Sequence, residues 1–217
     1  MNITVEQTLE MPDVVLFVRK LDAALKRERK KRERFYAMIE DERKVEFING
    51  EIYFQSPAKL RHTQAVGHLT LLLRAFVLAN RLGTVASEKL LVSLTRNDYE
   101  PDICFFRADV AKKFKPDQMQ FPAPDLVVEV LSQSTERHDR KIKFEDYAAH
   151  GVGEYWIIDP KTEVVEQYEL IGEKYQLLVK SGDGFVESRA VRGFSIPIQA
   201  IFQERTNFEA LKRIVAG

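Results

Sequence analysis

The pattern of hydrophobic and polar residues predicts a long buried helix in the first half of the chain. Between Ser56-Pro57 and Gly83, apolar side chains recur with the 3.6-residue period of an α-helix, and Gly83 suits the position just after its end. Further leucines make the helix apolar on more than one side, so it is either a core helix or part of a subunit interface. The periodic positions are Val66, Leu69, Leu73, Phe76 and Val77, and the further leucines are Leu71, Leu72 and Leu78.

Strand patterns surround this helix. Asn49-Gly50 predicts the tight turn of a hairpin over residues 44–54, because both central residues of a type I′ turn need positive φ. Asp125–Leu131 reads DLVVEVL, the near-continuous aliphatic run of a strand that is covered on both faces. A helix through 141–150 and a strand over Glu154–Asp159 follow it, which predicts a right-handed βαβ unit. Further strands are expected at 85–94, 102–106, 164–170 and 175–180, and a last helix near 207–215.

Charged residues are unevenly distributed along the chain. Its 217 residues include 33 Lys+Arg and 33 Asp+Glu, so the net charge is zero, but residues 26–34 read KRERKKRER. This run has no apolar residue and cannot form a coiled-coil seam. An exposed charged helix is the favoured interpretation, and contact with nucleic-acid phosphates is the alternative. We therefore predict an N-terminal helical, basic extension over residues 1–34 and one α/β domain over residues 35–217.

Composition and the chain start limit the location of the protein. The single cysteine, Cys104, excludes a disulfide scaffold and a cysteine-rich zinc site, and its apolar neighbours predict a buried, inert thiol. The first ten residues contain Glu6 and no apolar core, so they do not form a signal peptide. No apolar stretch reaches the length of about 20 residues that a membrane span needs. We expect a soluble, cytoplasmic protein with no membrane contact.

Polar groups occur where the pattern of a core predicts apolar ones. Glu129 lies in the middle of DLVVEVL, and Asp102 opens the strand ICFF. A buried carboxylate is disfavoured unless it is paired or binds a cation. Lys143 and Tyr147 share one face of a helix with Asp139, because they follow it at intervals of four residues. Each group also has an ordinary structural interpretation, as a strand-edge acid, a turn aspartate or a surface ion pair.

Two acids on adjacent strands with a lysine nearby suit metal-dependent phosphodiester hydrolysis. Carboxylates and phosphate oxygens are the ligands that Mg²⁺ prefers, and the bound ion activates water and stabilises charge on phosphorus oxygens. Other chemistries lack their motifs, since the chain has no GxGxxG, GxxxxGK[ST], GxSxG or HExxH.

These residues resemble a known family: the restriction endonuclease domains formerly called a domain of unknown function, which belong to the PD-(D/E)XK nuclease superfamily. The similarity covers about residues 35–202. It rests on VEFINGEI, on the following Arg61-His62, and on YEPDICFF, PDLVVEVLSQST, the helix segment that leads to EYWIIDP, and VVEQYEL.

The resemblance implies a restriction-endonuclease-like mixed sheet of four strands flanked by helices, and a divalent-metal nuclease site. Asp102 and Glu129 match the two acids of the motif. Leu131 replaces the lysine expected two residues after Glu129, and Lys143 on the following helix matches the lysine of this branch. Glu46 matches an additional acid, so Asp102, Glu129 and Glu46 are the implied metal ligands, while Tyr147 and His62 are candidates for supporting positions.

The sequence therefore favours a Mg²⁺-dependent endonuclease, with Mn²⁺ as a possible substitute, that acts on nucleic acid and above all on DNA. A homodimer is expected, because cutting two strands calls for two sites and the long apolar helix could lie across a two-fold axis. Two alternatives stay open. One is a nucleic-acid-binding or assembly module that retains the fold without turnover, and the other is a scaffold that binds neither metal nor nucleic acid.

Overall fold

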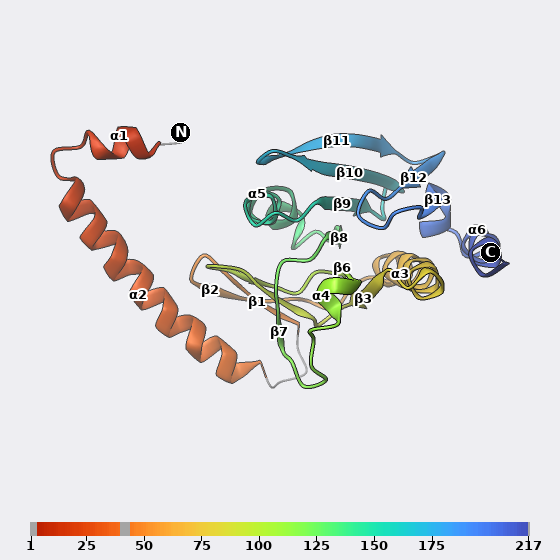
Figure 1. Ribbon diagram of the computed structural model, residues 1–217, viewed down its shortest axis with the longest axis horizontal. Helices are drawn as coiled ribbons and strands as arrows, with labels where there is room; N and C mark the ends of the chain where they lie inside the picture. Colours follow the sequence, from red (N-terminus) through yellow and green to blue (C-terminus); the bar gives the residue numbers. More distant parts are fainter. Residues whose placement is uncertain (1–3, 40–43, 217) are drawn as a thin grey trace.

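The computed structural model describes residues 4–39 and 44–216. Mixed β-sheets form the body of the protein, and helices flank them (Figure 1). None of the helices in these two ranges has the length and apolar character of a membrane span. The helices are α1 (Val5–Leu9), α2 (Val14–Met38), α3 (Leu60–Asn80), α4 (Ala108–Ala111), the π-helix η1 (His138–Lys143), α5 (Phe144–Ala149), the 3-10 helix η2 (Ile198–Ile201) and α6 (Glu204–Ala216).

The strands form a six-stranded sheet in the order β11-β10-β9-β8-β6-β3, a five-stranded sheet in the order β2-β1-β5-β4-β7, and the pair β12-β13. The strands of the first sheet are β3 (Gly83–Ser87), β6 (Ile103–Arg107), β8 (Leu126–Val130), β9 (Glu154–Asp159), β10 (Val164–Ile171) and β11 (Lys174–Ser181). The others are β1 (Val45–Ile48), β2 (Glu51–Phe54), β4 (Leu91–Ser93), β5 (Asp98–Tyr99), β7 (Gln120–Phe121), β12 (Phe185–Glu187) and β13 (Ser195–Pro197).

The predicted strand–helix–strand unit is present at the centre of the larger sheet. Strands β8 and β9 pair in parallel, with η1 and α5 in the connection between them. The remaining neighbours in this sheet pair antiparallel. The sheet is therefore mixed, as expected. Beside the four strands β9, β8, β6 and β3, which fit the implied four-stranded core, the hairpin β10–β11 adds two strands beyond β9.

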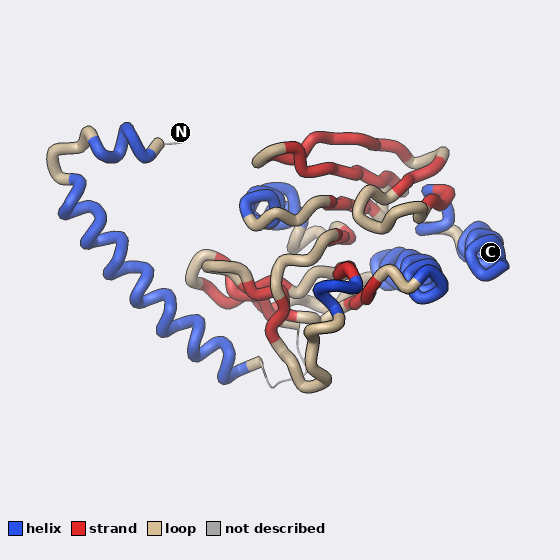
Figure 2. Tube along the Cα trace, viewed as in Figure 1, coloured by secondary structure: helices blue, strands red, loops and turns tan. Residues whose placement is uncertain are grey.

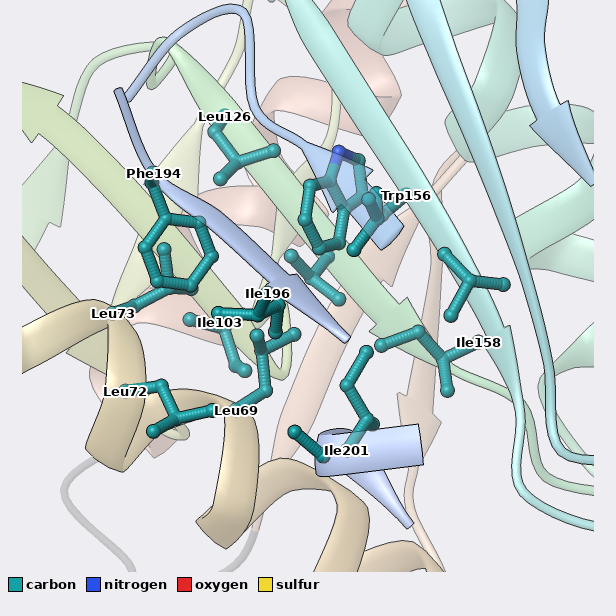
Figure 3. Close-up of a cluster of buried hydrophobic side chains, with 14 of the residues drawn as sticks. Leu69, Leu72, Leu73, Ile103, Leu126, Trp156, Ile158, Phe194, Ile196 and Ile201 are labelled. Carbon is teal, nitrogen blue, oxygen red and sulfur yellow. The ribbon is translucent and has the colours of Figure 1, made fainter. Parts of the chain in front are cut away.

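The main core lies between α3, α6 and one face of the six-stranded sheet. Figure 3 shows leucines of α3 and aliphatic and aromatic side chains of the strands in this layer, and Figure 2 shows α3 and α6 on the same side of the strands. The periodic apolar residues of α3 thus pack in the core, which confirms the interpretation of α3 as a core helix. Its outer side exposes Leu71 and Leu78, the latter to 80%.

The end of α3 differs from the prediction. Arg81, at φ 53°, takes the left-handed position after the helix, two residues before Gly83. Gly83 instead begins β3 at φ 151°, where an added Cβ would lie 2.0 Å from the carbonyl oxygen of Phe106. This glycine is therefore required by the close approach of the β3 and β6 backbones rather than by the helix end.

The Asn49-Gly50 hairpin forms as predicted. Strands β1 and β2 pair antiparallel around this turn, and Asn49 and Gly50 both have positive φ, 51° and 83°. The hairpin lies beside the second half of α2, whereas α1 and the first half of α2 extend away from the sheets (Figure 1). The basic run 26–34 lies within α2, and the boundary predicted after residue 34 falls inside this helix.

Candidate active site

Glu129 faces the smaller apolar layer because of the alternation of strand β8. Side chains of successive strand residues point to opposite faces, and Leu126, Val128 and Val130 pack on the α3 side. Val127 and Leu131 therefore belong to the opposite layer, under α5. Glu129 lies between them on that face and is only 2% exposed.

Asp102 lies beside Glu129, directly before the neighbouring strand β6. The antiparallel register of β6 and β8 pairs Ile103 with Val128, so that one step further Asp102 lies opposite Glu129. One Asp102 carboxylate oxygen, Oδ2, accepts a hydrogen bond of 2.8 Å from the backbone N–H of Val130. The two acids that the sequence identified thus lie on adjacent strands and on one face of the sheet.

The Lys143 ammonium is the centre of the acidic cluster. This side chain is 1% exposed, and its Nζ lies 2.9 Å from Glu46 Oε1 and 3.0 Å from Glu129 Oε1. Asp139 Oδ1 lies 3.1 Å from the same Nζ. Helix η1 carries Asp139 and Lys143, β8 carries Glu129, and β1 carries Glu46. Residues from three separate parts of the chain therefore meet at one ammonium group.

Aromatic and backbone groups complete this side of the cluster. The hydroxyl of Tyr147, in α5, donates a hydrogen bond of 3.3 Å to Glu129 Oε1. The backbone N–H of Glu100 donates one of 3.0 Å to Glu46 Oε1. Both carboxylates are thus fixed in direction by donors besides Lys143. Asp139 Oδ1 contacts Lys143 as an ion pair and has no hydrogen-bond partner among the described residues.

Asp102 has its own pair of nitrogen-bearing neighbours, Lys44 and His62. The Lys44 ammonium donates a hydrogen bond of 2.7 Å to Asp102 Oδ1, and His62 Nε2 lies 3.3 Å from Asp102 Oδ2. His62 comes from the first turn of α3, as its position near the start of the predicted helix suggested. The cluster therefore has two halves, one around Lys143 and one around Asp102.

Burial and charge pull the pKa values of these groups in different directions. Burial, together with the negative charges of Asp139 and Asp102, holds the pKa of Glu129 well above its usual range despite Lys143. Burial opposes the charge of Lys143, but the surrounding carboxylates outweigh it and hold its pKa well above its usual value. Burial would also raise the pKa of Asp102, yet Lys44 and His62 outweigh burial and lower it.

The charges of the cluster do not balance. Four buried carboxyl groups contact two ammonium groups, which would leave a net charge of −2 if all were ionised. A net charge of this size is costly in an apolar interior. The pKa values of Glu129 and Asp139 are both raised, which is the direction in which proton uptake lowers this charge. A divalent cation could relieve it equally well.

The donors fit a hard divalent ion in their chemistry. Mg²⁺ takes oxygen ligands, commonly one or two carboxylates completed by water and substrate phosphate, and Asp102 and Glu129 supply two carboxylates on adjacent strands. Within residues 4–39 and 44–216, no three His, Cys, Asp or Glu side chains converge closely enough to hold a metal ion by themselves. The fit is therefore to an ion that shares its ligands with water and substrate.

Two residues of the cluster were not among the predicted site residues. Asp139 was recognised only as sharing a helix face with Lys143, and Lys44 was not singled out. Lys44 and Glu46 are two residues apart in an extended segment and so point to the same side. This two-residue alternation was the feature of the sequence from which Lys44 could have been predicted as a site residue. Asp125, in contrast, accepts a hydrogen bond from the backbone of Arg107 at the opposite end of β8.

Comparison with known proteins identifies the family of this chain. The family Uma2, described as "Putative restriction endonuclease", matches residues 32–199. The chain belongs to this family. The uncharacterized protein sll1609 of Synechocystis sp. is 30% identical to it over 139 residues, which are 63% of this chain and 78% of that protein. The resemblance seen in the sequence is thereby confirmed.

A solved structure shares the Uma2 fold of this chain. It is described as a putative nuclease belonging to DUF820 from Anabaena variabilis, with a TM-score of 0.63 and 19% identity. The match covers 73% of this chain and 89% of that one. At this identity it establishes the fold: a mixed α/β architecture of the restriction-endonuclease-like type.

Proposed function

We propose that this chain is a divalent-metal-dependent nuclease that cleaves phosphodiester bonds in DNA. The observation that carries the proposal is the cluster of buried carboxylates around Lys143 and Asp102, whose full ionisation leaves an excess of two negative charges. Membership of a family described as putative restriction endonucleases supports the same conclusion. Mg²⁺ carries the charge that would balance the cluster, and Mn²⁺ would serve equally.

Asp102 and Glu129 would hold the metal ion from adjacent strands. Glu46 contacts the same Lys143 ammonium as Glu129, so it would bind the ion or position the attacking water. A bound Mg²⁺ would supply an activated water and charge stabilisation at the scissile phosphate.

Lys143 and the groups beside it would prepare the site for the reaction. Its ammonium donates to Glu129 Oε1 and also faces Glu46, so it orients both carboxylates. A cation in this place also stabilises negative charge that develops on the phosphate. The hydroxyl of Tyr147 and the ring of His62 would hold Glu129 and Asp102 in their orientations.

Plasmid cleavage tests the proposal. The wild-type chain is incubated with supercoiled plasmid and Mg²⁺, and Glu129→Gln and Asp102→Asn are expected to lower the nicking rate by about 100-fold or more. Asp125→Asn is the matched control, since it removes a carboxylate at the other end of β8 and should retain activity. Mg²⁺ should also raise the melting temperature of the wild type, and this rise should be lost in Glu129→Gln.

Equal nicking by the wild type and Glu129→Gln would contradict the assignment.

A second function is favoured by one observation: the lysine ammonium groups already contact each of the four carboxylates. Such a network could serve only to hold the fold, in a module that binds nucleic acid without cleaving it. Salt-sensitive DNA binding that survives Glu129→Gln, without cleavage or metal dependence, would identify that function.

A further inference from the structure

The N-terminal arm, residues 4–27, carries an apolar surface that the rest of the described chain does not cover. Figure 1 shows α1 and the first half of α2 apart from the sheets, and Val18 and Leu21 are 43% and 47% exposed. Exposed apolar patches of this kind mark interaction sites in proteins. The other large exposed apolar residues of the arm are Val5, Leu9, Val15, Leu16 and Phe17.

One face of α2 carries two of the exposed apolar residues, Val18 and Leu21, in line with residues that pack on the body of the protein. Residues 14, 18, 21, 25, 28, 32 and 35 follow each other at alternating steps of four and three, so they line one face of the helix. The last three of them contact the body of the protein. Glu28 pairs with Arg96, Arg32 with Asp98, and Phe35 is fully buried.

The first four positions of this face form what we call the seam: Val14, Val18, Leu21 and Leu25. Along α2, Glu28 is the first residue with a hydrogen bond to a described part of the body. The seam therefore lies on the same face of α2 as the residues that contact the body, but before the point at which these contacts begin. Its spacing is that of the a and d positions of a coiled coil, whose natural partner is another helix with the same spacing.

We propose that the seam binds the seam of a second copy of this chain in antiparallel orientation, which makes a dimer. In this orientation Val14 contacts Leu25 of the other copy and Val18 contacts Leu21, so the two seams pair side by side along their whole length. Phe17 flanks the seam and would lie against the small side chain of Ala24. The paired length ends where the body of each protomer begins.

Charge and space both exclude the parallel orientation. Beyond the seam, the face of α2 is covered by its own body at Glu28 and Arg32, so two parallel helices would bring both bodies to the same place. Parallel helices would also align the two basic runs 26–34, which carry seven basic and two acidic residues each. The antiparallel pair places the bodies and the basic runs at opposite ends.

The size of the contact predicts its strength. The seam spans about 18 Å of helix, so it buries less than the roughly 800 Å² per partner of a standard stable interface. A dimer that dissociates on dilution is therefore expected. The proposal does not depend on the nuclease function, because none of the residues of the seam belongs to the carboxylate cluster.

Sedimentation velocity of the full chain over a range of concentrations tests the dimer. Leu21→Glu places a charge in the seam and should raise the dissociation constant by at least about 100-fold. Ala23→Glu is the matched control, because Ala23 is exposed on the opposite side of the same helix, and it should dimerise like the wild type. Both positions are exposed in the protomer, so the far-UV circular dichroism of the variants should be unchanged.

Cross-linking tests the orientation. Val14→Cys and Leu25→Cys should form a disulfide-linked dimer when mixed and oxidised, whereas neither should cross-link alone, as it would in a parallel pair. The natural Cys104 is buried and does not interfere. A wild type that stays monomeric, a Leu21→Glu variant that dimerises normally, or cross-linking of either variant alone would overturn the proposal. So would a monomer that binds vesicles of anionic lipid through Leu21.

Discussion

Replacing Lys143 by methionine tests the central role of its ammonium in the stability of the fold. Methionine keeps the length and apolar volume of the side chain but leaves Glu46, Glu129 and Asp139 without the cation that lies 2.9–3.1 Å from each of them. Removing one partner from a buried ion pair costs about 3–5 kcal/mol, because the remaining charge is buried and uncompensated. For a domain of this size, this lowers the melting temperature by about 6–20 °C.

The loss should depend on pH in a definite direction. Without the ammonium, the pKa values of Glu129 and Asp139, already raised in the wild type, rise further in the folded state. When the pKa of an acid is higher in the folded state than in the unfolded state, the folded protein loses stability as pH rises from the unfolded pKa to the folded pKa. The gap in stability between wild type and variant should therefore be larger near pH 8 than near pH 5. Lys143 stays charged in the wild type at both pH values, since its folded pKa is raised.

Thermal unfolding by calorimetry at these two pH values measures the effect. Lys212→Met is the matched control: Lys212 lies 3.0 Å from Glu209, but both side chains are about half exposed. A surface pair contributes about 0–1 kcal/mol, so this control should lose little at either pH. If Lys143→Met melted like the control, the compensation argument would be wrong. An equal loss at pH 5 and pH 8 would show that lost packing, and not charge, causes the instability.

Two further predictions concern the ion pairs outside the cluster. Arg32→Ala should lower the free energy of unfolding in urea by about 3–5 kcal/mol, because Asp98, which is 0% exposed, loses its charged partner; an unchanged midpoint, or an equal loss in Arg29→Ala on the exposed side of α2, would contradict it. Although burial opposes the shift, hydrogen bonds from Arg140 and Tyr168 lower the pKa of Glu166 to about 2, so its contribution is present above its unfolded value near 4.5 and is lost as pH falls toward 2. Glu166→Gln should therefore cost about 1–2 kcal/mol at pH 7, after allowance for solvent screening, and much less near pH 3; a loss that did not change with pH would contradict this.

The sequence predicts best where one local pattern determines the structure. The Asn49-Gly50 turn and the aliphatic strand β8 have few alternatives, and both are found where the pattern predicted them. Glu129 was recognisable for the same reason, because a lone acid in such a strand breaks a strong pattern. The end of α3 was less certain, since Arg81 takes a conformation that glycine adopts more readily, and the contact between β3 and β6 that requires Gly83 is not local.

The convergence on Lys143 was less accessible from the sequence. The spacing placed Asp139 and Lys143 on one face of a helix, but it did not predict whether that face points toward the sheet or toward solvent. In the structure this segment is the π-helix η1, whose wider turn is common at functional sites and depends on tertiary contacts more than on residue preference. The contact between Lys44 and Asp102 joins segments 58 residues apart. No local pattern fixes a distance of that kind.

Strand alternation explains why the charged cluster is both costly and chemically useful. Since Val128 and Val130 face α3, Glu129 must face the layer under α5, where Val127, Leu131 and Tyr147 surround it. In such a layer the carboxylates cannot be screened by water, and therefore their charge must be met by a lysine, a proton or a cation. The lysines meet only part of it. The same apolar surroundings that raise the pKa of Glu129 therefore make this a place for protons or for one divalent cation, because either could balance the excess charge.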